Sequence, residues 1–461
     1  MVVRRPIRIL LAILLLSIVA AILLRVQQRW PRAMTIDQFD RVRVFRPWWQ
    51  QRGFVYVLSG ADGWSAADEW AALSYAARDN YVVGIDTPVL LDYINRTKKG
   101  CLFMNGLFED YSRVQQRTAE TPHFYPPIVL GRGTGASLVY LAQIGAPALA
   151  LGATVMLDPE PRLKLAPPIC EHPATQYPEG EQQIRPDPLG PNVPGRVWLD
   201  ANASDAARRF VSQIPHLPPQ DTVAPTVGSL RALYDAGLDD IEAERQRSGV
   251  GDLPLVEVPA ANPGRHVCAI LYSGDGGWRD LDRSLAGLLA ARGINVVGVD
   301  VLRYYWRTRS PESAAHDLAR IMQHYEKAWD CDQVILIGFS FGANVIPFMV
   351  NRLPTDQRVR LALISLLSPE KTTAFEVSPA GWVGKAAAAT IPVEPELKAL
   401  STKKLQCVYG QDEASASLCV TDAAQRFDII RKTGGHHFDK KYDQLADAIL
   451  SAVPAAAAPG R

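Results

Sequence analysis

The sequence has almost no excess of either charge. Its 49 Lys and Arg residues face 48 Asp and Glu residues, which gives a formal net charge of +1 at pH 7. Proteins that bind nucleic acid by electrostatics need a basic patch, and single-strand binders add aromatic side chains to it. No basic run interleaved with aromatic residues occurs in this chain. We therefore expect no nucleic-acid partner.

The sequence also lacks the usual motifs for metals and nucleotides. None of its six cysteines falls in a CxxC pair, the spacing that structural zinc sites use. Gly131-Arg-Gly-Thr-Gly135 has no following Lys and no full GxGxxG spacing, so it does not read as a phosphate-binding loop. The pair His436-His437 has no other ligand cluster to complete a metal site. We therefore expect neither a metal nor a cofactor.

A long apolar run is confined to the N-terminal segment, residues 1–33. Ile9 to Leu24 follows Arg4, Arg5 and Arg8, the order found in secretory signals and signal anchors. The run falls short of the roughly 20 residues of a comfortable membrane span. No small-x-small site is followed by a polar stretch, which favours an uncleaved anchor. A cleaved signal and a buried N-terminal helix are the alternatives.

The six cysteines are consistent with export, because disulfides persist outside the cytosol. Cys268 and Cys331 each stand just before an apolar strand candidate, Cys407 and Cys419 flank an acidic loop, and Cys101 and Cys170 remain. The alternative is that all six are free buried thiols. The expected bridges are Cys268–Cys331, Cys407–Cys419 and Cys101–Cys170.

The chain contains an internal repeat of domain length. Trp64 corresponds to Trp278 and Asp86 to Asp300, both at an offset of 214 residues. Repeats of a solenoid are much shorter, about 20–50 residues, so these are two domains. We place them at residues 34–225 and 226–461. The matching stretches are 55–64 with 269–278, 81–86 with 294–300, and 128–137 with 335–344.

Each copy alternates short apolar β-rich runs with helical stretches such as Trp278 to Ala291. Continuous apolar strands that alternate with helices indicate an α/β fold with mostly parallel sheets, covered on both faces. In such sheets ligands bind at the carboxyl ends of the strands. The Pro-rich insertion from Pro159 to Pro194 lacks helix or strand periodicity, so we expect a surface loop or a cap there.

The strongest catalytic signal is Gly338-Phe-Ser-Phe-Gly342. It follows the apolar run Val334 to Ile337 and precedes a helix-like segment from Ala343 to Val350. A serine at the apex of a strand–turn–helix is the nucleophile elbow of α/β-hydrolases, and its two glycines allow the tight turn. Ser340 is therefore the expected nucleophile. A structural serine in a glycine turn is the alternative.

The acid and the base should follow the nucleophile in that order along the chain. Asp412 follows the predicted strand Leu405 to Tyr409 and is the preferred acid, with Glu413 as the alternate. A Gly-Gly-His436-His437 loop follows the last predicted strand. We prefer His437 as the base, because Gly-x-x-His-Phe is the commoner form of this loop. The spacing permits His436 equally.

An oxyanion hole needs two backbone N–H groups. One is expected at Phe341, after the nucleophile, and the other in the turn Gly274-Asp275-Gly276. Asp275 would also bring a carboxylate to the reaction centre, where it could select a cationic substrate group. Capping of the following helix is the alternative role for Asp275.

The first copy has lost the nucleophile. Gly133 stands where Ser340 stands in the second copy. His216 occurs roughly where the base belongs, but without a serine it indicates little. We therefore expect two tandem α/β-hydrolase-like domains, of which the first is degenerate and serves binding, shielding or dimerisation.

The second copy, from about Leu253 to Leu450, resembles the VirJ/AcvB family of bacterial virulence proteins, and the two-domain layout is similar to its AcvB-type members. Asn344 and Val301 depart from it, standing where Asp and Ser are expected. The stretches that carry the resemblance are Ser273–Trp278, Leu302–Trp306, Gly338–Phe348, Asn351–Pro354 and Gly434–Asp439.

The resemblance implies a periplasmic serine hydrolase that cleaves the aminoacyl ester of aminoacyl-phosphatidylglycerol, such as lysyl-phosphatidylglycerol. The partner would then be a membrane phospholipid, and the N-terminal segment would hold the enzyme at the inner membrane. A periplasmic esterase, thioesterase or peptidase with a soluble substrate is the first alternative. A non-catalytic scaffold of an envelope secretion system is the second.

Overall fold

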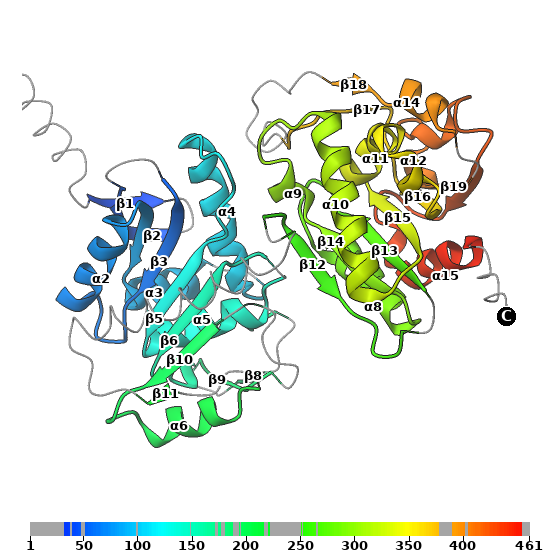
Figure 1. Ribbon diagram of the computed structural model, residues 1–461. Helices are drawn as coiled ribbons and strands as arrows, with labels where there is room; N and C mark the ends of the chain where they lie inside the picture. Colours follow the sequence, from blue (N-terminus) through cyan, green and yellow to red (C-terminus); the bar gives the residue numbers. More distant parts are fainter. Residues whose placement is uncertain are drawn as a thin grey trace, which may run out of the picture. The chain divides into compact units, whose positions relative to one another are not determined.

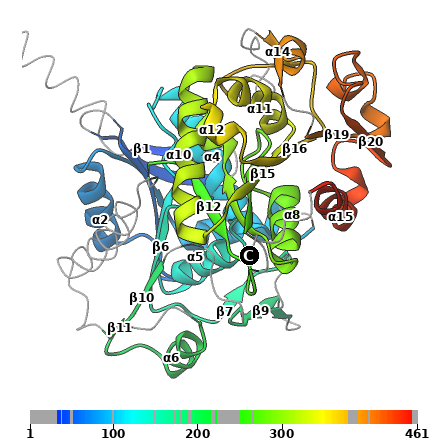
Figure 2. The same cartoon turned by 45° about the vertical axis from the view of Figure 1, so that its right-hand side comes forward.

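The structure is a computed structural model of the chain, shown from two directions in Figure 1 and Figure 2. The predicted N-terminal anchor, His216, most of the residues around the predicted domain boundary at 225 and 226, and residues 454–461 lie outside the residues it describes. The described residues are 32–36, 39–47, 51–97, 100–147, 149–170, 174–176, 180–187, 193, 195–215, 220–221, 250, 252–263, 266–377, 390–401 and 404–453.

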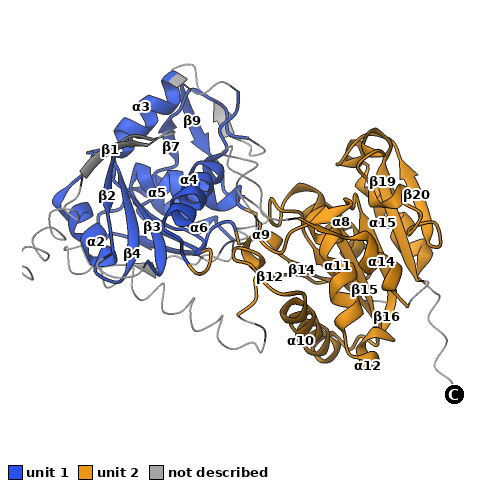
Figure 3. Cartoon of the chain, turned by 90° about the horizontal axis from the view of Figure 1, so that it is seen from above, with its two compact units in different colours: residues 1–121, 125–146, 150–241 blue, residues 122–124, 147–149, 242–461 orange. Residues whose placement is uncertain are grey.

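The chain forms two compact units, coloured separately in Figure 3. Unit 1 comprises Met1–Thr121, Tyr125–Ala146 and Ala150–Ile241. Unit 2 comprises Glu242–Arg461 together with the short segments Pro122–Phe124 and Pro147–Leu149.

Unit 1 is built on an eight-stranded sheet. The first two strands run antiparallel to their neighbours and the others are parallel. The strand order across the sheet is β1 (Arg32–Ile36), β2 (Phe39–Phe45), β4 (Asn80–Ile85), β3 (Gly53–Leu58), β5 (Ile128–Arg132), β6 (Ala153–Leu157), β10 (Gly195–Leu199) and β11 (Gln220–Asp221).

Unit 2 has a seven-stranded sheet in which only the edge strand β12 is antiparallel to its neighbour. The order is β12 (Leu255–Val258), β14 (Asn295–Val299), β13 (Val267–Tyr272), β15 (Gln333–Phe339), β16 (Leu361–Leu367), β19 (Leu405–Gly410) and β20 (Asp428–Lys432).

The two sheets have the same order and directions, except that unit 1 has one more strand, β1, at the edge. The seven strands of unit 2 correspond, in order, to seven strands of unit 1: β2, β4, β3, β5, β6, β10 and β11. The predicted fold class, two tandem α/β-hydrolase-like units with mostly parallel sheets, is therefore confirmed.

Helices cover both faces of each sheet, because successive strand residues point to opposite faces and both sets are apolar. In unit 2 (Figure 2), α10 (Pro311–Trp329) and α11 (Phe341–Arg352) pack on one face, and α8 (Asp280–Ala291) and α15 (Tyr442–Ala452) on the other. The short helices α9 (Val301–Tyr304), α12 (Thr355–Arg358) and α14 (Glu394–Ala399) complete this unit.

In unit 1, α2 (Ala66–Ala76) packs on one face of the sheet. Four helices pack on the other face: α3 (Thr87–Thr97), α4 (Met104–Thr118), α5 (Thr134–Ile144) and α6 (Asp205–Ser212).

The Pro-rich insertion, expected as a surface loop or a cap, contains regular strands. It holds a three-stranded antiparallel sheet in the order β7 (Arg162–Lys164), β9 (Glu181–Ile184) and β8 (Ala174–Gln176). Strands of three or four residues are too short to give a period-two pattern that the sequence alone would reveal. A further two-stranded sheet, β17 (Thr372–Thr373) with β18 (Ile391–Pro392), lies in unit 2.

Three disulfides join the cysteines in the expected pairs. Their Cα–Cα distances are 5.0 Å for Cys101–Cys170, 5.8 Å for Cys268–Cys331 and 5.5 Å for Cys407–Cys419. Such bridges are consistent with a periplasmic or secreted protein. Within the described ranges, no helix combines the length and apolar character that a membrane crossing needs.

Candidate active site at the carboxyl edge of the unit 2 sheet

Ser340 occupies a sharp turn between β15 and α11. Its backbone has φ 52° and ψ −117°, a left-handed conformation that non-glycine residues rarely adopt. The flanking glycines make the turn possible. A Cβ on Gly338 would lie 2.6 Å from the Ala343 nitrogen, and one on Gly342 would lie 2.4 Å from the Tyr272 carbonyl oxygen. Strand, turn and helix therefore match the elbow that the sequence predicts.

A histidine and a carboxylate meet at the ends of the next strands of the same sheet edge. His436 Nδ1, in the loop after β20, lies 2.7 Å from Glu413 Oε2, in the turn after β19. The Glu413 side chain is 21% exposed and that of His436 36%. The His436 ring also packs on Phe339, the residue before Ser340, with ring centroids 5.1 Å apart. This places the pair beside the turn that holds Ser340.

The pairing differs from the one preferred on sequence, which joined Asp412 to His437. Residues Gln411–Glu413 form a 3₁₀ turn, η1, and the Gly410 N–H donates to Glu413 Oε1 at 3.3 Å. That bond turns the Glu413 carboxylate back over the strand end, while Asp412 is left exposed. His437 is exposed as well. The alternates, Glu413 and His436, are therefore the residues that the structure brings together.

The pair shifts the protonation of both members. The Glu413 hydrogen bond raises the pKa of His436 against the opposing effect of burial, and the charges of Glu370 and Asp275 add to the increase. Burial would raise the pKa of Glu413, but hydrogen bonds from His436 and Ser368 outweigh it and lower that pKa. Both shifts favour the charged pair. By contrast, the desolvation of the part of the His437 ring that faces the protein and the charge of the neighbouring His436 lower the pKa of His437.

The turn after β13 borders Ser340 from the other side. A Cβ on Gly274 would lie 3.7 Å from the Ser340 Cβ. Helix α8 begins at Asp280 with Arg279 as its N-cap residue, so the helix-cap alternative for Asp275 is wrong. Asp275 is exposed, and its charge acts on His436. Phe341, the first residue of α11, is partly buried and contacts the Tyr305 ring.

Comparison with solved structures gives low-identity matches over less than half of this chain. Est1E from Butyrivibrio proteoclasticus is 12% identical, with 43% of this chain and 91% of that chain covered, at a TM-score of 0.33. An esterase from Pyrococcus furiosus, Pf2001, is 14% identical, with coverages of 44% and 92% and a TM-score of 0.32. TT1662 from Thermus thermophilus is 16% identical, with coverages of 45% and 95% and a TM-score of 0.33. No curated protein matches the chain.

The family model described as "Bacterial virulence protein (VirJ)" matches residues 266–457. The match covers less than half of the chain, and we refer to residues 266–457 as the VirJ domain because they resemble that family. The match spans the turns of Gly274 and Ser340 and both loops that carry Glu413 and His436, so every part of the candidate site lies in the VirJ domain.

Sequence reasoning missed the loop after β16 of the VirJ domain. Ser368 Oγ donates to the His436 carbonyl at 3.3 Å, and the Glu370 N–H donates to Asn344 Oδ1 at 2.7 Å. An aspartate at position 344 would offer a similar acceptor, so the Asn344 departure leaves this contact intact. The position of Ser368-Pro-Glu370 directly after an apolar strand was the available signal, because carboxyl strand ends share one edge of a sheet.

The scaffold beneath the VirJ site is buried and polar. Asp300 is fully buried, accepts a hydrogen bond from the Trp278 N–H at 3.1 Å and forms an ion pair with Arg303. Ser273 Oγ accepts from the Val301 N–H at 3.0 Å. These bonds fix the turn next to Ser340. Over the described part of the chain, no group of three or more His, Cys, Asp or Glu residues is arranged to hold a metal ion.

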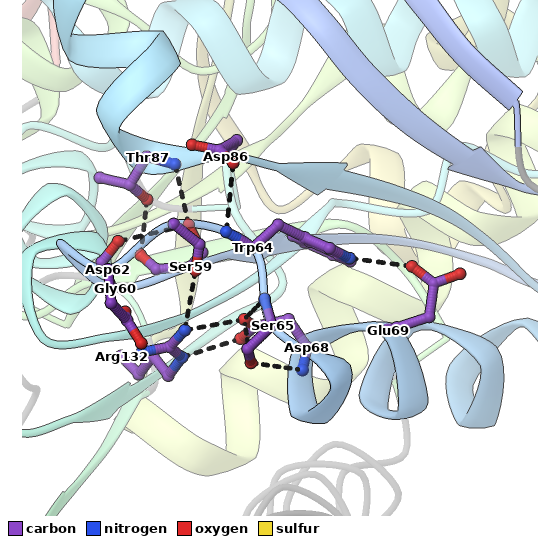
Figure 4. Close-up of polar contacts among 11 residues, drawn as sticks. Ser59, Gly60, Asp62, Trp64, Ser65, Asp68, Glu69, Asp86, Thr87 and Arg132 are labelled. Atoms are coloured by element: carbon purple, nitrogen blue, oxygen red, sulfur yellow. Dashed lines mark hydrogen bonds and ion pairs between the residues drawn. The ribbon is translucent and has the colours of Figure 1, made fainter.

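Unit 1 keeps this scaffold without the serine. Asp86 accepts from the Trp64 N–H at 3.1 Å and Ser59 from the Thr87 N–H at 2.9 Å (Figure 4). Asp300 and Ser273 accept the equivalent bonds in the VirJ domain. Gly133 has φ 53° and ψ −124°, within a few degrees of Ser340. The nucleophile turn of unit 1 is therefore folded, and only the side chain is lost.

Arg132 takes the place before this empty turn that Phe339 has in the VirJ domain. Its guanidinium donates to both Asp68 oxygens at 3.0 and 2.9 Å and to Asp62 at 2.6 Å (Figure 4). A Cβ on Gly60, the counterpart of Gly274, would lie 2.5 Å from an Arg132 nitrogen. The guanidinium thus covers the position that borders the nucleophile in the VirJ domain.

Proposed function

We propose that the VirJ domain is a serine ester hydrolase with Ser340 as nucleophile, His436 as general base and Glu413 as the acid that orients the base. The observation that carries the proposal is the His436–Glu413 contact of 2.7 Å at the same sheet edge as the strained Ser340 turn. A nucleophile on an elbow, a base beside it and a carboxylate holding that base are the parts of a serine hydrolase.

In this mechanism His436 Nε2 takes the proton from Ser340 Oγ as the oxygen attacks the ester carbonyl carbon. Nδ1–H donates to Glu413, which selects the required tautomer and stabilises the imidazolium that forms. His436 then returns the proton to the leaving alcohol, and an acyl group remains on Ser340. Water repeats the sequence to release the acid.

The tetrahedral intermediate carries a negative oxygen that needs preorganised N–H donors. The proposal assigns one donor to the backbone N–H of Phe341, at the start of α11. The other comes from the turn Gly274–Gly276. The α11 N-terminus adds the favourable end of the helix dipole at the same point.

For the substrate we infer the aminoacyl ester of aminoacyl-phosphatidylglycerol, such as lysyl-phosphatidylglycerol. The family match supports this inference. The exposed carboxylates of Asp275 and Glu370 also support it, because their charges reach His436 and would favour a cationic acyl group. The three disulfides agree with an enzyme outside the cytosol. The predicted N-terminal anchor would keep it at the periplasmic face of the membrane.

The test is lipid analysis of cells that make lysyl-phosphatidylglycerol and express either the wild-type protein or Ser340→Ala at matched levels. We expect the wild type to deplete the lysyl lipid and the variant to leave it unchanged. Purified protein is then given the same lipid in vesicles and a soluble ester. Cleavage of the soluble ester alone would replace the lipid substrate with a soluble one, and cleavage of neither would overturn the hydrolase assignment.

A further inference from the structure

Unit 1 has a pocket of about 580 Å³ that none of the steps above uses. Three segments line it: the stretch around β7, the end of β9 with the residues after it, and one side of α6. Ile184 and Phe210 are buried and form its apolar part. The pocket therefore combines a partly apolar floor with walls from three separate elements.

The walls of this pocket are strongly basic. Arg162, Arg185 and Arg209 all line it, one from each segment, and all three are exposed. Arg162 Nε donates to Gln183 Oε1 at 3.3 Å, which holds that side chain along the wall. Of the described lining residues, only Glu160 carries a negative charge. Its carboxylate accepts a hydrogen bond from Ser204 Oγ at 3.3 Å, and the three arginines still leave the described lining with an excess of positive charge.

The pocket is tied to the degenerate nucleophile turn. Ser137 Oγ, in the first turn of α5, donates to the Glu160 carbonyl and to the Gly133 carbonyl, the latter at 3.3 Å. Glu160 itself follows the carboxyl end of β6 by three residues. The pocket thus opens at the sheet edge where ligands bind in α/β folds, but one strand beyond the lost serine.

We infer that this pocket binds the phosphate group of an anionic ligand. One guanidinium fork satisfies a planar carboxylate in a bidentate pair. A tetrahedral phosphate offers oxygens in several directions, so it can accept from three forks that come from three elements. Unit 1 is then an anion-binding module built on a hydrolase scaffold. A phosphodiester headgroup of a lipid and a free organic phosphate share this chemistry.

The test uses the full chain and two probes. Inorganic phosphate is titrated calorimetrically, and vesicles of phosphatidylglycerol in phosphatidylcholine are co-sedimented with the protein, against pure phosphatidylcholine. The pocket variant is Arg185→Gln/Arg209→Gln. The control variant, Arg46→Gln/Arg96→Gln, removes the same charge from exposed arginines of unit 1 that do not line the pocket.

We expect the pocket variant to bind at least one probe about fivefold more weakly or worse, because it loses two exposed charged contacts. The control variant should change binding by less than about twofold. Cleavage of a soluble ester should not change in either variant. Loss on anionic vesicles identifies a lipid headgroup, and loss on inorganic phosphate alone identifies a soluble phosphate. The proposal is overturned if neither probe binds saturably, or if both variants weaken binding equally.

Discussion

The two units share one fold but carry different residues at the nucleophile turn. Gly133 and Ser340 have nearly the same backbone angles, and in each unit an aspartate and a serine fix the neighbouring turn by hydrogen bonds. The units differ in the turn residue, which is Gly133 in one and Ser340 in the other, and in the side chain before it. Phe339 packs against His436, whereas Arg132 binds Asp62 and Asp68. The turn of a hydrolase fold can therefore be kept after the nucleophile is lost, because contacts other than those of the serine side chain stabilise it.

The largest expected contrast between the units is at the two turns themselves. Ser340→Ala should lower ester hydrolysis by roughly 10³-fold or more, because the nucleophile is lost while alanine accepts the same backbone strain as serine. Gly133→Ser should create no activity, because Arg132 covers the neighbouring Gly60 position, the counterpart of Gly274 in the VirJ domain. Hydrolysis of nitrophenyl butyrate and labelling with a fluorophosphonate probe measure both. Probe labelling anywhere in unit 1, or a fully active Ser340→Ala, would contradict the comparison.

The second expected contrast is between neighbouring residues of the VirJ domain. Glu413→Gln should slow turnover by about 10²- to 10⁴-fold, because the amide no longer holds the productive tautomer of His436. Asp412→Asn, one residue earlier and exposed, should change kcat by less than threefold. His436→Ala and His437→Ala should differ in the same direction. If Asp412→Asn and His437→Ala cause the larger losses instead, the acid and base assignments must be exchanged.

The third expected effect belongs to unit 1 and is one of stability. Arg132→Met leaves Asp68, which is 5% exposed, without its cationic partner. Breaking a buried pair costs about 3–5 kcal/mol, and because Arg132 is 20% exposed we expect roughly 2 kcal/mol. Hydrogen exchange should quicken in α2 and β5 but not in the VirJ domain. The control is Asp62→Asn, which removes the charge of the exposed partner of Arg132. Equal losses of stability in both variants would show that the buried Arg132–Asp68 pair has no special importance.

The fourth expectation is a pH dependence that only the VirJ domain has. The reactive His436 must be neutral, and its pKa is raised by Glu413, Glu370 and Asp275. The acid limb of kcat/KM should therefore have its inflection above the ordinary histidine value of about 6.5. Glu413→Gln should move the residual inflection downward. A wild-type inflection at or below the ordinary value would contradict the His436–Glu413 pair.

The His436–Glu413 pair affects stability and activity in opposite directions as the pH changes. A histidine whose pKa is raised by folding stabilises the native state below its unfolded pKa, and this contribution is lost as pH rises through the folded pKa. The protonated pair is therefore the more stable form and the neutral histidine the reactive one.

The smallest expected contrast concerns Asp275, whose counterpart in unit 1 is Ala61. Asp275→Asn should weaken cleavage of lysyl-phosphatidylglycerol about fivefold more than cleavage of a neutral acyl ester, because an exposed carboxylate contributes modestly to binding a cation. Asp412→Asn is the matched control for the lost charge. Equal losses on both esters would make Asp275 a turn residue without a part in specificity.

Local patterns determined much of this protein in advance. The Gly-x-Ser-x-Gly turn after an apolar strand located the Ser340 elbow, and the repeated stretches located two copies of one fold. The cysteine placements predicted Cys268–Cys331 and Cys407–Cys419, because strand starts and loop ends limit which thiols can meet, and Cys101–Cys170 followed as the remaining pair. Gly133 marked the degenerate copy, since a glycine keeps the backbone of the turn and removes its chemistry.

Only the tertiary structure decided between adjacent residues. Asp412 and Glu413 have the same relation to β19 in sequence, as His436 and His437 have to β20, and spacing cannot separate neighbours. The 3₁₀ turn Gln411–Glu413 and the Gly410 hydrogen bond direct one carboxylate inward and leave the other in solvent. The Arg132 cover on Gly60 and the three-arginine pocket of unit 1 likewise join residues far apart in sequence. Such contacts depend on how strands and loops pack together, which no local pattern in the chain records.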